Sequence, residues 1–331
     1  MVNVAFELGN QVKEELEYSE YLDSIDYDSL LVMGMGGSGV AGDVLSLLSN
    51  ETSSKNVIVR KTYSIPEKII LKKPFCLFIS YSGNTEETIS GINDAISNEL
   101  DWAVISSGGK LISYAEKHKK PYIKIPKGLQ PRAAFGYLTK AVCKFIDLAE
   151  NTDYLEEIKS VGDYLNYILE EKENADIFLS SKELSKKIKN KTCVIYGGTP
   201  LTELVSARWK TQINENAKSK AYIGSMPEIH HNEILSWDAD PESSKNDYAL
   251  IFLRDDEEHP QIKKRFELTE KLLGDKVGIY NIEIKTSVSL LKKLMELVLF
   301  GDLFSISLSD ELGMIPEDIE RIEKLKEMLG D

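Results

Sequence analysis

The sequence predicts an α/β protein made of two domains, each a doubly wound parallel sheet. Short apolar segments alternate with longer segments of helical periodicity, which is the pattern of parallel strands joined by helices. The alternation stops in a charged stretch at residues 151–181 and then starts again. The chain has 331 residues, whereas a single domain usually has about 100–200. We therefore expect an N-terminal domain at residues 1–150 and a C-terminal domain at residues 151–331.

The first half begins with a segment of helical periodicity at residues 6–22. The next segment, 29–34, is short, apolar and followed by glycines, as is typical of a buried parallel strand that leads into a tight turn. Further strands are expected at residues 57–61, 75–80, 102–106 and 122–125, and helices at 40–48, 85–96, 111–118 and 133–148.

The second half repeats this order after a bridging helix within residues 151–181. Strands are expected at 192–196, 220–223, 249–253 and 277–280, and helices from residue 201 and at 261–273, 288–307 and 316–329. The strand, glycine turn and helix at 31–48 resemble those at 194–210, which is a sign of duplication. After the third strand the first half has a polar loop, whereas the second half has the acidic run 254–258 (RDDEE), which would repel phosphate. The two halves are therefore expected to have separate roles.

Charge and apolar patterning narrow the possible partners. The formal net charge is −14 with no long run of Lys or Arg, which argues against a nucleic acid or an anionic membrane. No apolar run approaches the ~18 residues that a membrane span needs. The Glu-rich N-terminus lacks the pattern of a targeting segment. Cys76, Cys143 and Cys193 each lie in an apolar run, as expected for buried free thiols in a reducing compartment. We expect a cytoplasmic protein.

The sequence contains few candidate ligands for a metal ion and no complete motif for a dinucleotide cofactor. The four histidines are His118, His230, His231 and His259. They form no HxH or HExxH spacing, and no CxxC is present, so zinc or iron ligation is disfavoured. A dinucleotide fold would need an acidic residue near the end of the strand after its glycine loop, but that strand ends in Arg60 and Lys61. We expect neither a metal nor a cofactor.

Two loops of the first half are candidates for binding phosphate. Residues 34–39 (GMGGSG) lie between a strand and a helix, where glycines let a ligand approach the backbone and free helix N–H groups favour an anion. Residues 80–88 (SYSGNTEET) also follow a buried strand and supply several hydroxyls. A structural tight turn is the alternative for the first loop, and helix capping by Thr85 and Thr88 is the alternative for the second. Two such loops at strand ends of one sheet favour a ligand site.

These loops together resemble the sugar isomerase (SIS) domain. With further motifs, the whole chain resembles the archaeal-type bifunctional phosphoglucose/phosphomannose isomerase family. The additional motifs are Pro131-Arg132, Arg208-Trp209-Lys210, Asn214-Glu215-Asn216-Ala217-Lys218 and His231-Asn232-Glu233. The resemblance implies two SIS-type domains and a metal-independent interconversion of glucose 6-phosphate or mannose 6-phosphate with fructose 6-phosphate. It also implies that the substrate phosphate binds at Gly37, Ser38, Ser80, Ser82 and Thr85.

The reaction itself requires a ring-opening acid or base, one carboxylate that moves a proton between C1 and C2, and a cation for the cis-enediolate. The resemblance assigns the carboxylate to Glu215, which lies near the end of the helix that begins at residue 201. It assigns ring opening to His231, and His230 is the alternative. Glu233, in the same motif, is the rival candidate for the base and could instead orient His231.

Two cations complete the expected site. Arg132 follows the last strand of the first domain, and the family motif assigns it to the enediolate. Its alternative is a surface salt bridge. Lys326, in the terminal helix, corresponds to a family lysine that reaches the sugar, although Lys324 is only two residues away.

Two other classes of function compete with the isomerase. A non-catalytic sugar-phosphate sensor usually carries an effector domain, and no helix-turn-helix or basic segment is evident here. Half of an amino-sugar synthase would need a glutaminase domain with an N-terminal Cys, whereas position 2 is Val2. For the isomerase we expect a homodimer in which His231 reaches across the interface.

Overall fold

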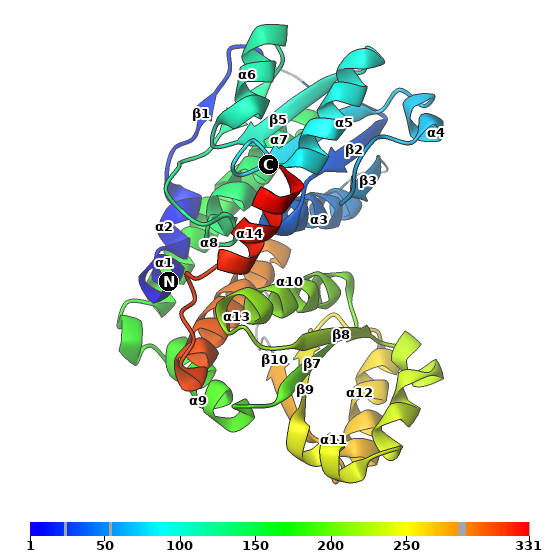
Figure 1. Ribbon diagram of the computed structural model, residues 1–331, viewed down its shortest axis with the longest axis vertical. Coiled ribbons are helices and arrows are strands. Elements are labelled where there is room, and N and C mark those ends of the chain that lie inside the picture. The colour runs from blue at the N-terminus through cyan, green and yellow to red at the C-terminus, as the bar shows by residue number, and fades with distance from the viewer. Residues whose placement is uncertain (23–24, 53–54, 284–288, 331) are drawn as a thin grey trace. The chain divides into compact units, whose positions relative to one another are not determined.

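The structure is a computed structural model that describes residues 1–22, 25–52, 55–283 and 289–330 (Figure 1). The chain folds into two compact units. One is Glu7–Asn166, and the other combines Tyr167–Gly330 with the N-terminal residues Met1–Phe6. The division lies inside the charged stretch at 151–181, beyond the predicted position at residue 150. We refer to Glu7–Asn166 as the N-terminal unit and to the other as the C-terminal unit.

The N-terminal unit contains a six-stranded sheet in the order β1-β6-β5-β4-β2-β3. All neighbours are parallel except β1, which pairs antiparallel with β6. The strands are β1 (Glu17–Tyr18), β2 (Ser29–Met33), β3 (Asn56–Arg60), β4 (Phe75–Ser80), β5 (Trp102–Ser106) and β6 (Tyr122–Lys124). The helices are α2 (Leu8–Lys13), α3 (Gly36–Thr52), α4 (Glu67–Ile70), α5 (Glu86–Ser97), α6 (Gly109–His118), η1 (Pro131–Ala133), α7 (Phe135–Glu150) and α8 (Tyr154–Ile168).

Alternation along the strands divides the core of this unit into two faces. Leu31, Phe78 and Val104 point to one face, where they pack with buried side chains of α5 and α6. On the other face, the Phe75 ring lies 6.1 Å from the ring of Phe145 in α7. Helices therefore cover both faces of the sheet (Figure 1), as a doubly wound fold requires.

The predicted helix at 6–22 was wrong. The chain instead forms α1 (Val2–Phe6) and α2, and then strand β1. The Lys140 ammonium donates hydrogen bonds to the carbonyls of Lys13, at 3.2 Å, and Glu14, at 2.5 Å. This cation binds the free carbonyls at the end of α2, so the helix stops there because of a contact with a residue far along the chain.

The C-terminal unit contains a four-stranded parallel sheet in the order β10-β9-β7-β8. Its strands are β7 (Thr192–Gly197), β8 (Ala221–Ser225), β9 (Tyr248–Arg254) and β10 (Gly278–Glu283). Its other helices are η2 (Lys172–Asn174), α9 (Asp176–Ile188), α10 (Pro200–Asn216), η3 (Glu228–His231), η4 (Glu233–Asp238), α11 (Pro241–Asp247), α12 (Pro260–Leu273), α13 (Leu290–Leu312) and α14 (Glu320–Leu329).

Several predicted boundaries in this half were wrong. The expected bridging helix at 151–181 is two helices, α8 and α9, separated by η2. The terminal helix begins at Glu320 rather than at residue 316. The predicted start of α13 at residue 288 lies outside the described residues, and α13 extends beyond residue 307 to Leu312.

The two sheets share one strand order. β5-β4-β2-β3 in the N-terminal unit corresponds to β10-β9-β7-β8 in the C-terminal unit, strand for strand. A glycine-containing turn links β2 to α3 in one unit and β7 to α10 in the other, and each of these helices has 17 residues. The predicted fold class, two doubly wound parallel-sheet domains, is confirmed.

Two further properties concern the chain as a whole. In the described part of the chain, no helix is both long and apolar enough to cross a lipid bilayer. Cys76, Cys143 and Cys193 are buried and unpaired. Burial raises the pKa of the Cys76 and Cys193 thiols to about 12, so both remain protonated at neutral pH.

Candidate functional site

The two predicted phosphate loops lie at the carboxyl ends of β2 and β4, which are neighbouring strands. Gly36 has a φ of +53°, a conformation that favours glycine. A Cβ on Gly37 would lie 3.1 Å from the Pro131 carbonyl oxygen, so the turn is closely packed. The backbone N–H of Tyr81 donates a hydrogen bond of 3.0 Å to Ser38 Oγ, which joins the two loops directly. The structure therefore brings these predicted residues together.

The hydroxyls of the second loop divide into buried and accessible ones. Ser80 is 1% exposed, and its Oγ accepts a hydrogen bond from the Gly83 N–H and lies 2.8 Å from Thr85 Oγ1. Ser82 is exposed, and its Oγ accepts from the Asn84 N–H at 3.2 Å. Ser80 thus shapes the loop and orients Thr85.

The surroundings of Thr85 test the alternative that this residue only caps helix α5. It occupies the N-cap of α5, yet within the described residues its side chain makes no capping hydrogen bond. Its hydroxyl is half-buried and is held by Ser80 instead. Helix capping therefore does not account for Thr85, and the free N–H groups of the first turn remain suited to an anion.

Arg132 lies in η1, which follows β6 and precedes α7. It is 4% exposed, so the alternative prediction, a salt bridge at the protein surface, is wrong for Arg132. The Gln11 side chain fastens this turn. Its Nε2 donates to the Ala133 carbonyl at 2.9 Å, and its Oε1 accepts from the Gly136 N–H at 3.1 Å. Sequence reasoning missed Gln11 because its partners lie more than 120 residues away.

Glu215 lies in the last turn of α10, where it is half-buried. The Lys218 ammonium donates to the Glu215 carbonyl at 2.6 Å and to the Pro316 carbonyl at 3.2 Å. The end of α10 is thereby tied to the segment between α13 and α14.

A buried polar network holds α10 against α13. Arg208 donates to both carboxylate oxygens of Asp302, at 2.9 and 2.7 Å, and Gln212 Nε2 donates to Asp302 at 2.6 Å. Asn216 Nδ2 donates to Ser305 Oγ at 2.9 Å. Arg208, Gln212 and Asn216 recur every four residues, and this spacing places them along one side of a helix. Two of the motif residues therefore serve to position the helix that carries Glu215. Spacing could have shown the polar row, but not its partner Asp302.

The two adjacent histidines have different surroundings. His231 ends η3 and is exposed. His230 lies 2.7 Å from Thr269 Oγ1 through Nε2, and 2.8 Å from Arg265 Nη1 through Nδ1. Burial, the Arg265 guanidinium and His231 lower the pKa of His230. With both ring nitrogens engaged, His230 is poorly suited to open a sugar ring.

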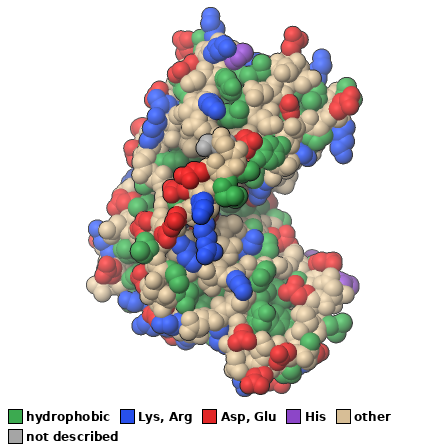
Figure 2. Space-filling model, viewed as in Figure 1, with side chains coloured by type: hydrophobic (Ala, Val, Ile, Leu, Met, Phe, Trp, Pro, Cys, Tyr) green, Lys and Arg blue, Asp and Glu red, His purple; other side chains and the backbone are tan. Residues whose placement is uncertain are grey.

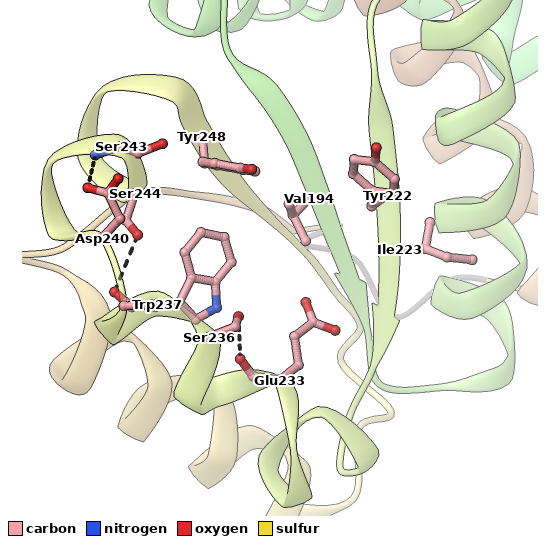
Figure 3. Close-up of a pocket in the computed structure, with 11 residues that line it drawn as sticks. Val194, Tyr222, Ile223, Glu233, Ser236, Trp237, Asp240, Ser243, Ser244 and Tyr248 are labelled. Atoms are coloured by element: carbon pink, nitrogen blue, oxygen red, sulfur yellow. Dashed lines mark hydrogen bonds between the residues drawn. The ribbon is translucent and has the colours of Figure 1, made fainter.

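Glu233 lies beside a pocket of about 590 Å³ (Figure 3). The Tyr196 hydroxyl donates a hydrogen bond of 2.6 Å to Glu233 Oε1. Figure 3 shows the Glu233 carboxylate directed toward strands β7 and β8, with Trp237 beside it. Glu233, the rival candidate for the base, lines this pocket, whereas Glu215, His231, Arg132 and Lys326 are not among its lining residues.

The acidic loop after β9 occupies the place that the loop 80–85 has in the N-terminal unit. Lys293, 1% exposed, forms ion pairs with Asp255, at 3.1 Å, and with Asp256 and Glu257. Arg254 pairs with Glu258 at 2.8 Å. Lys293 and Arg254 therefore neutralise part of the negative charge of this loop. The corresponding loop of the N-terminal unit carries hydroxyls instead.

Lys324 and Lys326 both lie on α14, whose residues are all exposed. Figure 2 shows charged and hydrophobic side chains together at the surface of α14. Residues two apart on a helix point in directions about 200° apart, so the two ammonium groups face different sides.

Glu215, His231 and Lys326 lie on α10, η3 and α14 of the C-terminal unit. Within the described ranges, no group of three or more His, Cys, Asp or Glu side chains is arranged to hold a metal ion.

The chain is similar in sequence to known sugar-phosphate enzymes. Residues 180–329 match the bacterial phospho-glucose isomerase C-terminal SIS domain. The bifunctional phosphoglucose/phosphomannose isomerase of Thermoplasma volcanium is 35% identical over 96% of this chain and 97% of its own length. The enzyme of the same name from Aquifex aeolicus is 34% identical over 93% of this chain and 92% of its own length.

The fold has matches among solved structures. The crystal structure of glucosamine-6-phosphate deaminase from Thermotoga maritima superimposes with a TM-score of 0.66 at 13% identity. The match covers 96% of this chain and 94% of that one. At this identity the likeness concerns the fold alone.

Proposed function

Because this chain belongs to the bifunctional phosphoglucose/phosphomannose isomerase family, we propose that it interconverts glucose 6-phosphate and mannose 6-phosphate with fructose 6-phosphate. The chain is a sugar-phosphate aldose–ketose isomerase. The observation that carries the choice of substrates is the similarity to such enzymes along more than nine-tenths of the chain.

In this proposal the N-terminal unit binds the phosphate. Gly37 and Ser38 supply the first loop, and Ser80, Ser82 and Thr85 supply the second. The hydrogen bond from the Tyr81 N–H to Ser38 supports one continuous cradle. The first turns of α3 and α5 add free N–H groups, which favour an anion.

Proton transfer between C1 and C2 then proceeds through a cis-enediolate with Glu215 as the base. The carboxylate removes the proton from C2 of the open aldose and returns it to C1, while the hydroxyl proton on O2 is lost and O1 gains one. C2 is oxidised to a ketone as C1 is reduced to an alcohol, so no net oxidation occurs and neither a metal nor a redox cofactor is needed. Support for Glu215 comes from its rigid helix, which the buried Arg208–Asp302 pair holds in place.

Three further residues complete the proposed mechanism. His231 opens the sugar ring by exchanging a proton with the ring oxygen. Arg132 stabilises the negative charge of the enediolate, and Lys326 contacts the sugar. The burial of Arg132 supports its role because a charge in a poorly solvated environment acts more strongly than one in water.

We further propose that the protein is a cytoplasmic homodimer in which His231 is contributed across the interface. The exposure of His231 at the end of η3 supports this, as does the frequency of closed two-fold symmetry among oligomers. Three buried, unpaired cysteines suit a reducing compartment. The acidic net charge of −14 argues against nucleic acid and membrane partners.

A coupled assay with each aldose phosphate, run with and without a chelator, tests this proposal. We expect turnover of both aldoses that survives the chelator. Loss of turnover with the chelator would place the protein in a metal-dependent class. Sugar-phosphate binding without any turnover would favour the non-catalytic sensor.

A further inference from the structure

His230, the neighbour of the proposed ring-opening residue, has both ring nitrogens in contact with α12. Its Nε2 lies 2.7 Å from Thr269 Oγ1, and its Nδ1 lies 2.8 Å from Arg265 Nη1. The Thr269 hydroxyl also donates to the Arg265 carbonyl at 2.7 Å. Thr269 is fully buried, so water does not compete for this hydroxyl.

These contacts determine where the imidazole proton lies. A hydroxyl has one proton, and Thr269 uses it toward the Arg265 carbonyl, so Thr269 Oγ1 must accept from His230 Nε2–H. A guanidinium only donates, so His230 Nδ1 must be the unprotonated acceptor. His230 is therefore a neutral imidazole with its proton on Nε2. A second proton, on Nδ1, would face an Arg265 N–H and break the contact.

The same segment is anchored a second time by its neighbour. Ile229 is 3% exposed and belongs to the core cluster that includes Phe266 of α12. The His230 N–H donates to the Pro227 carbonyl at 3.0 Å, which closes the turn. Ile229 is thus buried in the core of the C-terminal unit and His230 is bonded to α12, whereas the next residue, His231, is exposed.

We propose that His230 is a positioning residue, which together with Thr269 and Arg265 attaches η3 to α12 and so sets the direction in which His231 leaves the fold. This rests on the proposed role of His231 in ring opening. His230 acts through its fixed tautomer and exchanges no proton with the substrate. The sequence alone left His230 as an alternative acid or base, and these contacts assign it a different role.

The test compares Thr269→Val, which removes the hydroxyl with little change in volume, with Thr269→Ser, which keeps it. Ring opening is measured as enzyme-catalysed exchange between α and β anomers of glucose 6-phosphate by NMR. Proton transfer is measured separately as solvent deuterium incorporation into a four-carbon aldose 4-phosphate, which cannot close a ring. We expect Thr269→Val to slow anomer exchange about tenfold or more, because small displacements of a catalytic group are costly. Deuterium incorporation should be unchanged, and Thr269→Ser should resemble the wild type.

A second pair of variants keeps the proposal testable if Thr269→Val does not fold. Arg265→Leu removes the donor to Nδ1, whereas Arg265→Lys keeps a charged donor. Arg265→Leu should reproduce the selective loss of anomer exchange, and Arg265→Lys should restore part of it. Histidine ¹⁵N NMR of the wild type should show a neutral His230 protonated at Nε2 at pH 7. An imidazolium there, or an equal loss of both activities in folded Thr269→Val and Arg265→Leu, would overturn the proposal.

His231→Ala separates failure of this inference from failure of the proposed function. If His231→Ala exchanges anomers normally, His231 is not the ring-opening residue, and the positioning role falls with it. If His231→Ala stops exchange while folded Thr269→Val and Arg265→Leu leave it intact, the anchor alone is wrong and the proposed function stands.

Discussion

At the scale of single residues, the polar groups of the phosphate loops have two kinds of surroundings. Ser38 and Ser80 are buried and already hydrogen-bonded to the loop backbone. Ser82 and Thr85 are more accessible. Buried hydroxyls that order a backbone are expected to affect folding and binding together, whereas the accessible hydroxyls can be changed with less structural cost.

Thr85→Val should weaken substrate binding, because it removes a hydroxyl whose hydrogen bond to a charged group is worth about 1.5–3 kcal/mol. In steady-state kinetics, KM should rise by about ten- to a hundredfold while kcat falls less. Ser82→Ala should have a smaller effect, and Thr85→Ser is the matched control. Unchanged KM in both Thr85→Val and Ser82→Ala would place the phosphate elsewhere.

Glu215→Gln should lower kcat by about 10²–10⁴-fold, which is the usual contribution of a general acid–base group. Gln is nearly isosteric but cannot accept the proton, so binding should largely survive. The variant should also lose solvent deuterium incorporation at C2 of the product aldose. Glu233→Gln is the comparison, since Glu233 already accepts a hydrogen bond from Tyr196. If Glu215→Gln turned over substrate at a near-wild-type rate, another residue would have to be the base.

At the scale of elements, the packing of α10 against α13 fixes the position of the helix that carries Glu215. Arg208 Nη2 donates to both carboxylate oxygens of Asp302, and the Arg208 side chain is 1% exposed. A buried ion pair adds little net stability over apolar packing, but removing one partner leaves a buried charge uncompensated.

Asp302→Ala should therefore destabilise the C-terminal unit by about 3–5 kcal/mol. Denaturant unfolding, followed by the fluorescence of buried Trp209 on α10, measures this loss. The double variant Arg208→Met/Asp302→Leu should recover much of the stability because it leaves no unpaired charge. A single variant as stable as the double one would show that the ion pair does not hold the helices together.

At the scale of the whole molecule, two units with one strand order carry different chemistry at corresponding strand ends. The loop after β4 presents hydroxyls, whereas the loop after β9 presents carboxylates paired with Lys293 and Arg254. A second phosphate cradle in the C-terminal unit is therefore disfavoured by charge. This division agrees with the proposed placement of phosphate binding in one unit and of Glu215 and His231 in the other.

The proposed homodimer predicts complementation between two inactive variants. If His231 is contributed across the interface, a mixture of His231→Ala and Glu215→Gln protomers contains heterodimers with one intact site. Activity should then appear on mixing under conditions that allow subunits to exchange. Exchange is followed independently with differently labelled protomers. Mixtures that exchange subunits yet remain inactive would exclude the shared site.

The sequence by itself determined the features that depend on neighbouring residues. Period-two and helical patterns, with glycines after strands, located β4 and β5 correctly to the residue and predicted both sheets. Prediction from the sequence failed where a residue distant in the chain ends an element. Lys140 binds the carbonyls at the end of α2, and the helix therefore stops earlier than its periodicity predicts. Local motifs also singled out the two loops that carry Ser38, Ser80 and Thr85, and these loops follow neighbouring strands, whereas the binding of phosphate by these residues stays a prediction.

Tertiary structure alone decided which polar residues hold others in place. Gln11 beside Arg132, Asp302 beneath α10, and Thr269 with Arg265 around His230 have partners that spacing along the chain does not reveal. The physical reason is that a hydrogen bond needs two groups within about 3 Å. Only the folded chain brings residues as far apart in sequence as Arg208 and Asp302 to that distance.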